Sequence, residues 1–506
     1  MNTILALDAG TTNVKAILVD QSGNVVAQSS VPLAIQFPKD GWVEQSPAEI
    51  LSATGKAIED CLKKGSDHEV LALGISNQRE TVVAWNRHTG QAIYPCIVWQ
   101  CRRSASICES LRSKGLAEKI RTRTGLQVDP LFPATKIQWL FENQPEIGKL
   151  AERGDLCIGT VDAWLVWNLT EGKQFRTDYS NASRTQLLNL RDGVWDPELL
   201  ELFGIPRSVL PELTGSNERF GEVTLPGGKS IPIRGVLGDS HAALLGHGVL
   251  QKGKVKATYG TGSSLMTLCD APETDNRRVS TTIAWKLDGI QYAYEGNITA
   301  TGSGLAWAVD FTGCDDLGGA VTKATELAEN GNVYFVPALA GLGAPHWEES
   351  ARGSIVGLSF GTGREYLVRA ALEAIVYQIK DVFDTMQEAA GARLEALLTD
   401  GGASRNNWLM QFQADLLDRP VHRSGTAELS GLGAAFAAGL GVGLWSSTEE
   451  VAEALAPHDQ FEPAMDNEKR KRLVRGWNRA VESVKALAAE RRSSGVAGVQ
   501  EFSSGG

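Results

Sequence analysis

A carboxylate, a short polar turn and a lysine follow one another within eight positions near the start of the chain. Asp8 ends one apolar run, Lys15 leads into a second, and between them lie Gly10, Thr11, Thr12 and Asn13. A tight turn exposes successive backbone N–H groups, and threonine and asparagine side chains add donors, so this turn could bind a phosphate. Lys15 would add a positive charge, while Asp8 would repel the phosphate unless Mg²⁺ lay between them. An ordinary β-hairpin with a polar turn fits the same residues.

A second turn of the same kind opens the second half of the chain. Residues 252–270 consist of two strand-like runs and a central turn that contains Gly260, Thr261, Gly262, Ser263 and Ser264. A nucleoside triphosphate held between two domains needs phosphate donors from each side. The repetition therefore favours nucleotide binding over two unrelated hairpins.

Two further pairs of glycines precede helices. Gly302 and Gly304 lie at the start of one helical segment, and Gly401 and Gly402 precede a helix that we expect to start near Asn406. Glycine lets the backbone approach a ligand closely, and a helix N-terminus carries positive potential. Both segments are therefore candidates for contact with a nucleotide.

The elements that must position these turns are a mixture of strands and helices. Strand-like runs occupy residues 3–8, 14–20, 24–30 and 70–76. Helical periodicity extends over residues 47–63, 104–119 and 136–150, and the end of a further helix covers residues 162–170. This mixture, with short turns rich in glycine, asparagine and aspartate, predicts an α/β architecture, with α+β as the alternative.

The two similar hairpins predict two related domains, over residues 1–248 and 249–492. The last helix, residues 468–492, carries a basic run that could be a nucleic-acid patch. On an acidic protein such a run is better explained as a solvated helix face. Residues 493–506 are expected to form a flexible tail.

The composition is typical of a globular enzyme and excludes several classes of protein. Of 506 residues, 42% are hydrophobic and 22% are charged, and the net charge is −11. Nucleic acids and anionic membranes are poor partners for this chain, because both require a basic surface. The longest uncharged apolar run, residues 431–445, is too short to span a membrane and is expected to be a buried helix. Seven scattered cysteines without a C-x-x-C pair, and no visible signal peptide, predict a cytoplasmic protein.

Ten motifs, in order between residues 3 and 490, resemble the FGGY family of carbohydrate kinases and, within it, the glycerol kinases. They are DAGTTNVKA (8–16), SNQRETVVAW (76–85), IVWQCRR (97–103), GTVDAWLVWNLT (159–170), TDYSNASRT (177–185), GDSHAALLG (238–246), TYGTGSS (258–264), VPALAGLGAPHW (336–347), ARGSIVGL (351–358) and DGGASRNNWLMQFQADLL (400–417). So many matches in one order are highly specific. The resemblance implies two actin-like (RNase H-like) domains, with a nucleotide and substrate cleft between them.

The resemblance also implies a reaction, the transfer of the γ-phosphoryl group of ATP to a hydroxyl of a small polyol or sugar. It implies Mg²⁺ beside Asp8 and a catalytic base at Asp239, whose carboxylate would accept the hydroxyl proton. The residues that match nucleotide contacts are Gly10, Thr11, Thr12, Asn13, Lys15, Gly260, Thr261, Gly302, Gly401, Gly402 and Asn406. From the residues alone, Asp239 fits a helix N-cap equally well.

The substrate pocket resembles that of glycerol kinases only in part. Arg79 and Glu80 match glycerol-binding residues, since a donor and an acceptor side by side can hold neighbouring hydroxyls. Trp99 matches an apolar wall of the pocket. Without the family, the Arg–Glu pair would be interpreted as a surface ion pair at the end of a strand.

Leu131, Ser240 and Ser264 stand where glycerol kinases have Tyr, Gln and Phe, so the pocket loses both volume and hydrogen-bonding groups. The space favours a four- or five-carbon polyol or ketose, and the alternative is drift within glycerol kinases that still act on glycerol. A non-catalytic actin-like sensor that only binds nucleotide is a more distant alternative. The expected partners are a small polyol or sugar and, by analogy with relatives, further copies of the chain in a homodimer or homotetramer.

Overall fold

The computed structural model of the chain describes residues 1–272, 274, 277–455 and 458–493. The N-terminal unit comprises Met1–Lys252, Met266–Glu295 and Thr426–Pro457. The C-terminal unit comprises Gly253–Leu265, Gly296–Gly425 and His458–Gly506. The predicted domains over residues 1–248 and 249–492 stay a prediction. Apart from Ser493, the predicted tail lies outside the described residues.

The N-terminal unit is built on a six-stranded sheet with the order β13-β14-β5-β1-β2-β3. Its strands are β1 (Asn2–Ala9), β2 (Asn13–Asp20), β3 (Val25–Pro32), β5 (Glu69–Asn77), β13 (Gly221–Thr224) and β14 (Ser230–Gly238). The first four confirm the predicted strands. β5 is parallel to both β1 and β14, so the carboxyl ends of these three strands lie at one edge of the sheet.

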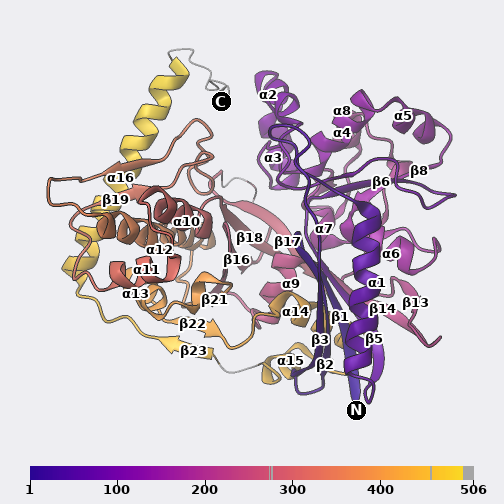
Figure 1. Cartoon of the computed structure of the whole chain (residues 1–506). Helices are drawn as coiled ribbons and strands as arrows, with labels where there is room; N and C mark the ends of the chain where they lie inside the picture. The colour runs from indigo at the N-terminus through magenta and orange to yellow at the C-terminus, as the bar shows by residue number, and fades with distance from the viewer. Residues whose placement is uncertain (273, 275–276, 456–457, 494–506) are drawn as a thin grey trace. The chain divides into compact units, whose positions relative to one another are not determined.

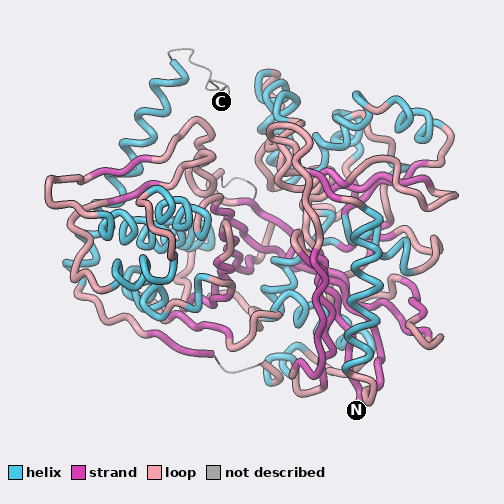
Figure 2. The backbone as a smooth tube through the Cα atoms, viewed as in Figure 1, coloured by secondary structure: helices cyan, strands magenta, loops and turns pink. Residues whose placement is uncertain are grey.

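Helices α1 (Pro47–Lys64) and α14 (Leu429–Val442) cover opposite faces of this sheet. Leu5 of β1 and Ile50 of α1 belong to one hydrophobic core, and Figure 2 shows α1 running alongside the strands. Gly74 of β5 faces α14, where an added Cβ would lie 2.3 Å from the carbonyl oxygen of Ala434. This close approach places α14, the predicted buried helix, directly against the sheet.

A second core of the N-terminal unit surrounds a four-stranded sheet with the order β4-β7-β6-β8. Its strands are β4 (Glu44–Gln45), β6 (Val82–Asn86), β7 (Cys96–Ile97) and β8 (Leu156–Thr160). The helices and short strands of the unit's remaining chain are α2 (Ala105–Ser113), α3 (Ala117–Thr124), α4 (Pro133–Asn143), α5 (Pro145–Glu152), α6 (Val161–Leu169), β9 (Arg176–Asp178), α7 (Tyr179–Ala182), β10 (Leu188–Asn189), β11 (Val194–Trp195), α8 (Pro197–Phe203), η1 (Arg207–Val209), β12 (Glu212–Thr214), α9 (Asp239–Gly246), β17 (Ser280–Lys286) and α15 (Thr448–Glu453).

Two segments of this region that were each predicted as one helix form two helices instead. The segment 104–119 divides into α2 and α3, because Gly115 adopts a left-handed conformation with φ +73° and ends the first helix. The segment 136–150 divides into α4 and α5, because Pro145 cannot continue a helix and instead begins the next one. The helix predicted to end near residue 170 is confirmed as α6.

The C-terminal unit combines parallel strands with long helices (Figure 1). Its strands are β15 (Lys254–Tyr259), β19 (Tyr334–Val336), β20 (Ser354–Val356), β21 (Ala396–Asp400), β22 (Val421–Ser424) and β23 (His458–Phe461), and β16 (Ser263–Cys269) and β18 (Ile290–Ile298) belong partly to each unit. Its helices are α10 (Gly302–Phe311), α11 (Leu317–Thr325), α12 (Arg364–Ala390), η2 (Ala403–Arg405), α13 (Asn407–Leu417) and α16 (Asn467–Ser493). β15, β21 and β22 are mutually parallel neighbours, so the loops that follow β15 and β21 leave the same edge.

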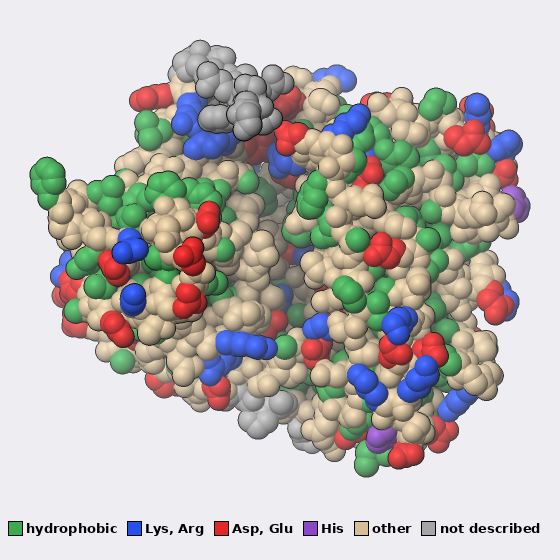
Figure 3. Space-filling model, viewed as in Figure 1, with side chains coloured by type: hydrophobic (Ala, Val, Ile, Leu, Met, Phe, Trp, Pro, Cys, Tyr) green, Lys and Arg blue, Asp and Glu red, His purple; other side chains and the backbone are tan. Residues whose placement is uncertain are grey.

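The structure describes all seven cysteines, and none of them forms a disulfide. Within the described part of the chain, no helix combines the length and the apolarity that crossing a membrane requires. Figure 3 shows acidic and basic side chains interspersed on the visible surface of each unit.

Candidate active site

The turn between β1 and β2 is held in place by side chains from outside the hairpin. Asp8 and Lys15 lie opposite each other in the antiparallel register, and the turn connects their strands. The indole Nε1 of Trp99 donates to Oγ1 of Thr11 at 3.0 Å, and Nε2 of Gln45 donates to the carbonyl oxygen of Thr11 at 2.7 Å. The predicted phosphate turn and the predicted substrate wall at Trp99 therefore touch.

Asp8 lies in an environment that suits a cation. Its Oδ1 accepts a hydrogen bond from the hydroxyl of Ser76 at 2.9 Å. Burial, followed by the negative charge of Asp239, raises the pKa of Asp8 to about 6. A buried carboxylate beside a second negative charge gains stability when a cation lies near it. Among the described residues, no group of three or more His, Cys, Asp and Glu side chains is arranged to hold a metal, so a Mg²⁺ ion at Asp8 would take most ligands from water and phosphate.

Lys15 is engaged by a residue that the sequence did not single out. Its ammonium group lies 3.0 and 3.1 Å from the two carboxylate oxygens of Glu428, at the N-cap of α14. Glu428 is 413 positions away in the chain, and no sequence motif connects the two residues.

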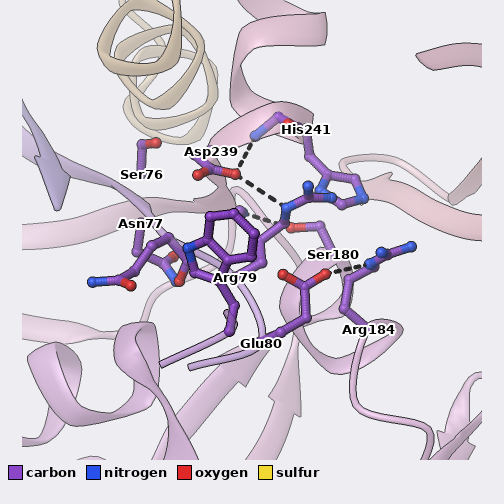
Figure 4. A network of polar contacts seen from close by, with 12 residues as sticks. Ser76, Asn77, Arg79, Glu80, Ser180, Arg184, Asp239 and His241 are labelled. Atoms are coloured by element: carbon purple, nitrogen blue, oxygen red, sulfur yellow. Dashed lines mark hydrogen bonds and ion pairs between the residues drawn. The ribbon is translucent and has the colours of Figure 1, made fainter. Parts of the chain in front are cut away.

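Arg79 and Glu80 lie just after β5, separated from it by Gln78, and are buried, with 8% and 4% of their surface exposed. The alternative of a surface ion pair is therefore wrong. Nε of Arg79 donates to Oδ1 of Asp239 at 3.0 Å. Figure 4 shows Arg79 extending toward Asp239, and Glu80 extending toward Arg184.

Glu80 adopts a left-handed backbone conformation, with φ +59°. Such a conformation is uncommon for a residue with a side chain and costs on the order of 1–3 kcal/mol. Two buried basic side chains hold Glu80 in it, since Nε of Arg184 donates to its carboxylate at 2.7 Å and Nζ of Lys136 donates to its carbonyl oxygen at 3.0 Å. The sequence singled out neither of these two side chains, although Arg184 lies in the family motif at 177–185.

Asp239 is the first residue of α9, and its side chain is 36% exposed. The N-cap of this helix is Gly238, so the N-cap alternative for Asp239 is wrong by one residue. The hydroxyl of Ser180 accepts the N–H of Gly238 at 2.9 Å, and the N–H of Ser240 donates to Oδ1 of Asp239 at 2.6 Å. The carboxylate therefore lies at the N-terminal end of a helix, which carries positive potential.

The residues that depart from the glycerol kinase pattern border this cluster. Ser240 is buried next to Asp239, and Leu131 is half-buried before α4. Nζ of Lys136 donates to the carbonyl oxygen of Leu131 at 2.6 Å as well as to that of Glu80. Lys136 thus connects Leu131, at a predicted wall of the pocket, to Glu80, which is predicted to bind the substrate.

The C-terminal unit brings the second turn and the start of α10 together. The N–H of Gly302 donates to the carbonyl oxygen of Gly260 at 3.1 Å, and the N–H of Thr301 donates to that of Thr261 at 3.1 Å. A Cβ at Gly302 would lie 2.7 Å from the oxygen of Gly260, so only glycine fits this approach. Ser264 follows the turn at the second position of β16 and is half-buried.

The loop after β21 lies against the same turn. Gly401 has φ +92°, and a Cβ there would lie 2.4 Å from the carbonyl oxygen of Tyr259. Gly402 is the N-cap of η2, and Asn406 caps α13 by accepting the N–H of Leu409 at 3.0 Å. The helix predicted to start near Asn406 is confirmed. Gly260, Gly302 and Gly401, three of the glycines predicted to contact the nucleotide, therefore lie close together in the C-terminal unit.

Comparisons with known proteins identify the family of the chain and its fold. Residues 3–246 match the FGGY family of carbohydrate kinases, N-terminal domain, and residues 255–442 match the C-terminal domain of the same family. A glycerol kinase of Carboxydothermus hydrogenoformans is 46% identical over 488 residues, which are 94% of this chain and 97% of that protein. An apulose kinase of Pectobacterium atrosepticum is also 46% identical, over 486 residues, which are 94% of this chain and 97% of that protein.

A solved structure of Plasmodium falciparum glycerol kinase with ADP has the same fold, with a TM-score of 0.90 and 35% identity. The match covers 96% of this chain and 98% of that one. The predicted two-domain α/β fold and the predicted kinase class are confirmed. This chain belongs to the FGGY family of carbohydrate kinases.

Proposed function

We propose that the chain transfers the γ-phosphoryl group of ATP to a hydroxyl of a small polyol or ketose, with Asp239 as the general base. The observation that carries the proposal is the environment of Asp239. Its carboxylate is 36% exposed and is oriented by the buried Arg79, while the neighbouring Glu80 lies in a strained conformation. Strain and buried charges of this kind are concentrated at functional sites.

Asp239 accepts the proton of the acceptor hydroxyl while the oxygen of that hydroxyl bonds to the γ-phosphorus. ADP leaves with the electrons of the broken phosphorus–oxygen bond. Arg79 and Glu80 orient the acceptor, the first as a donor and the second as an acceptor of hydrogen bonds. A guanidinium has five N–H donors, which is more than the contacts of Arg79 with Asp239 and Glu295 use.

The nucleotide in this proposal is bound by the turns of both units. Its contacts are Gly10, Thr11, Thr12, Asn13, Lys15, Gly260, Thr261, Gly302, Gly401, Gly402 and Asn406. Lys15 would exchange its partner Glu428 for a phosphate oxygen, which makes this ion pair a contact to be broken on binding. Asp8 would hold Mg²⁺, which would neutralise charge that develops on the phosphates.

The acceptor that we favour has four or five carbon atoms. Leu131 and Ser240 offer neither the bulk nor the polar groups of the Tyr and Gln that the resemblance to glycerol kinases leads one to expect at these positions. The relatives with 46% sequence identity include both a glycerol kinase and an apulose kinase. Sequence identity therefore does not favour glycerol over a longer acceptor. The alternatives are a glycerol kinase with an altered pocket and, more distantly, a sensor that binds nucleotide without phosphorylating anything.

The test is the release of ADP from Mg-ATP in the presence of glycerol, erythritol, threitol, erythrulose, xylulose, ribulose or apulose. We expect at least one longer acceptor to exceed glycerol in kcat/KM. A preference for glycerol over every longer acceptor would refute the enlarged pocket and leave a glycerol kinase. ADP release that no acceptor stimulates would refute the transferase and favour the sensor.

A further inference from the structure

A buried network of charges connects Arg79 to Glu80 through residues that the proposed reaction does not use. Arg79 contacts Oε1 of Glu295 at 2.8 Å through one terminal nitrogen, and Arg184 contacts Oε2 of Glu295 at 2.7 Å. Arg184 also contacts Glu80, and Arg79 also contacts Asp239. The five side chains therefore form one chain of ion pairs, in the order Asp239, Arg79, Glu295, Arg184 and Glu80.

Glu295 is the centre of this network and is completely buried, with 0% exposure. It lies in β18, paired with Ser280 of β17. Burial alone would raise the pKa of Glu295, but the charges of Arg184 and Arg79 lower it to well below its usual range. The carboxylate therefore stays charged and uses one oxygen for each guanidinium.

The exposed fractions of the side chains decide which residues of the network an acceptor could contact. Asp239 is partly exposed, whereas Arg184 and Glu295 have at most 1% of their side chains accessible. An acceptor could reach Asp239, but Glu295 is too deeply buried to touch it. A role for Glu295 must act through the two arginines.

We propose that Glu295 is a positioning residue for the phosphoryl transfer that we propose above. Because it binds both guanidiniums, it fixes the direction in which Arg79 presents Nε to Asp239. Through Arg184 it also fixes the carboxylate of Glu80. Loss of one carboxylate would release both substrate-orienting residues at once, and it would leave the charge of Arg79 balanced mainly by the base itself.

The test replaces Glu295 in the full-length chain by Gln, which keeps the shape but removes the charge, and by Asp, which keeps the charge. The Asp side chain is one methylene shorter and cannot reach both arginines. We expect kcat for the best acceptor to fall by about 100-fold in Glu295→Gln, since misplacement by about 1 Å has effects of this size. We expect a fall of about 10-fold in Glu295→Asp, because the retained charge restores part of the balance. KM for ATP should change by less than about two-fold in both, since its proposed contacts lie elsewhere.

Glu373→Gln is the matched control. Glu373 is equally buried in an ion pair with Arg369, at 2.7 Å, in α12 of the C-terminal unit. It should lose stability to a similar extent but keep the wild-type kcat, and thermal unfolding of all variants separates the two effects. Activity within two-fold of wild type in both Glu295 variants would overturn the positioning role, as would an equal loss of kcat in Glu373→Gln. A wild-type chain that phosphorylates no acceptor would instead refute the proposed function and, with it, this inference.

Discussion

Gly238 allows the most direct perturbation of the contact between Arg79 and Asp239. An added Cβ at Gly238 would lie 2.6 Å from both Cγ and Cδ of Arg79, and 3.2 Å from Nδ1 of His241. Carbon atoms in contact are ordinarily separated by about 3.5–4.0 Å, so the overlap is about 1 Å. The backbone of Gly238, with φ −64° and ψ 146°, suits alanine, which leaves the clash as the main effect of Gly238→Ala.

Arg79 can relieve this clash only by moving away from its partners. A shift of about 1 Å would stretch its contact with Asp239, now 3.0 Å, beyond the usual range of an N–H···O hydrogen bond. We expect kcat/KM for the acceptor to fall about 100-fold, which corresponds to about 2.7 kcal/mol of transition-state stabilisation. The overlap should also lower the free energy of unfolding by about 1–3 kcal/mol.

Gly55→Ala provides the control for this experiment. Gly55 lies in α1, and an added Cβ there meets nothing within 4 Å. Alanine should stabilise this helix by up to about 1 kcal/mol and leave the activity unchanged. Steady-state kinetics and thermal unfolding of both variants are the assay. A folded Gly238→Ala variant with kcat/KM within about three-fold of wild type would refute the role assigned to the Arg79–Asp239 contact.

Three other perturbations test separate parts of the site. Asp8→Ala should lower kcat and raise the Mg²⁺ concentration that half-saturates activity. An unchanged dependence of activity on Mg²⁺ would contradict the proposed metal role of Asp8 and leave the hairpin with a structural role only. Burial lowers the pKa of Lys136 from 10.5 to about 7, so between these values the unfolded chain carries a proton that the folded chain lacks. The unfolding free energy of wild type relative to Lys136→Met should therefore rise with pH across this window, by up to about 1.4 kcal/mol per unit, and a flat difference would contradict the shift. The preference among acceptors should move toward glycerol in the triple variant Leu131→Tyr, Ser240→Gln and Ser264→Phe. If the ratio of kcat/KM for glycerol to kcat/KM for the best longer acceptor did not change, these positions would not determine specificity.

The sequence was most informative where local pattern and chemistry coincide. Apolar runs predicted β1, β2, β3 and β5, and the glycine-rich segments singled out Gly260, Gly302 and Gly401, which lie close together in the folded chain. Helix continuity was harder to predict, because one glycine or proline outweighs several turns of favourable periodicity. Gly115 and Pro145 each divided a predicted helix in this way.

The charged partners of the site residues could not be predicted from local sequence patterns. Glu428 approaches Lys15 from 413 positions away, and Glu295 contacts Arg79 and Arg184 from a strand whose sequence gives no sign of a buried charge. Only the folded chain brings such residues together, since their pairing depends on tertiary packing rather than on spacing. The family resemblance identified Arg79, Glu80 and Asp239 but not the carboxylate that joins the two arginines.

The central claim is that Asp239 accepts the proton of an acceptor hydroxyl, and the most direct test compares wild type with Asp239→Asn. The measurement is the amount of phosphorylated acceptor formed from Mg-ATP, detected by ³¹P NMR with the best acceptor of the panel. We expect the wild type to form the phosphate ester, and Asp239→Asn to form it at least about 100-fold more slowly with nearly unchanged affinity for ATP. Formation of the ester at a near-normal rate by Asp239→Asn would contradict the claim.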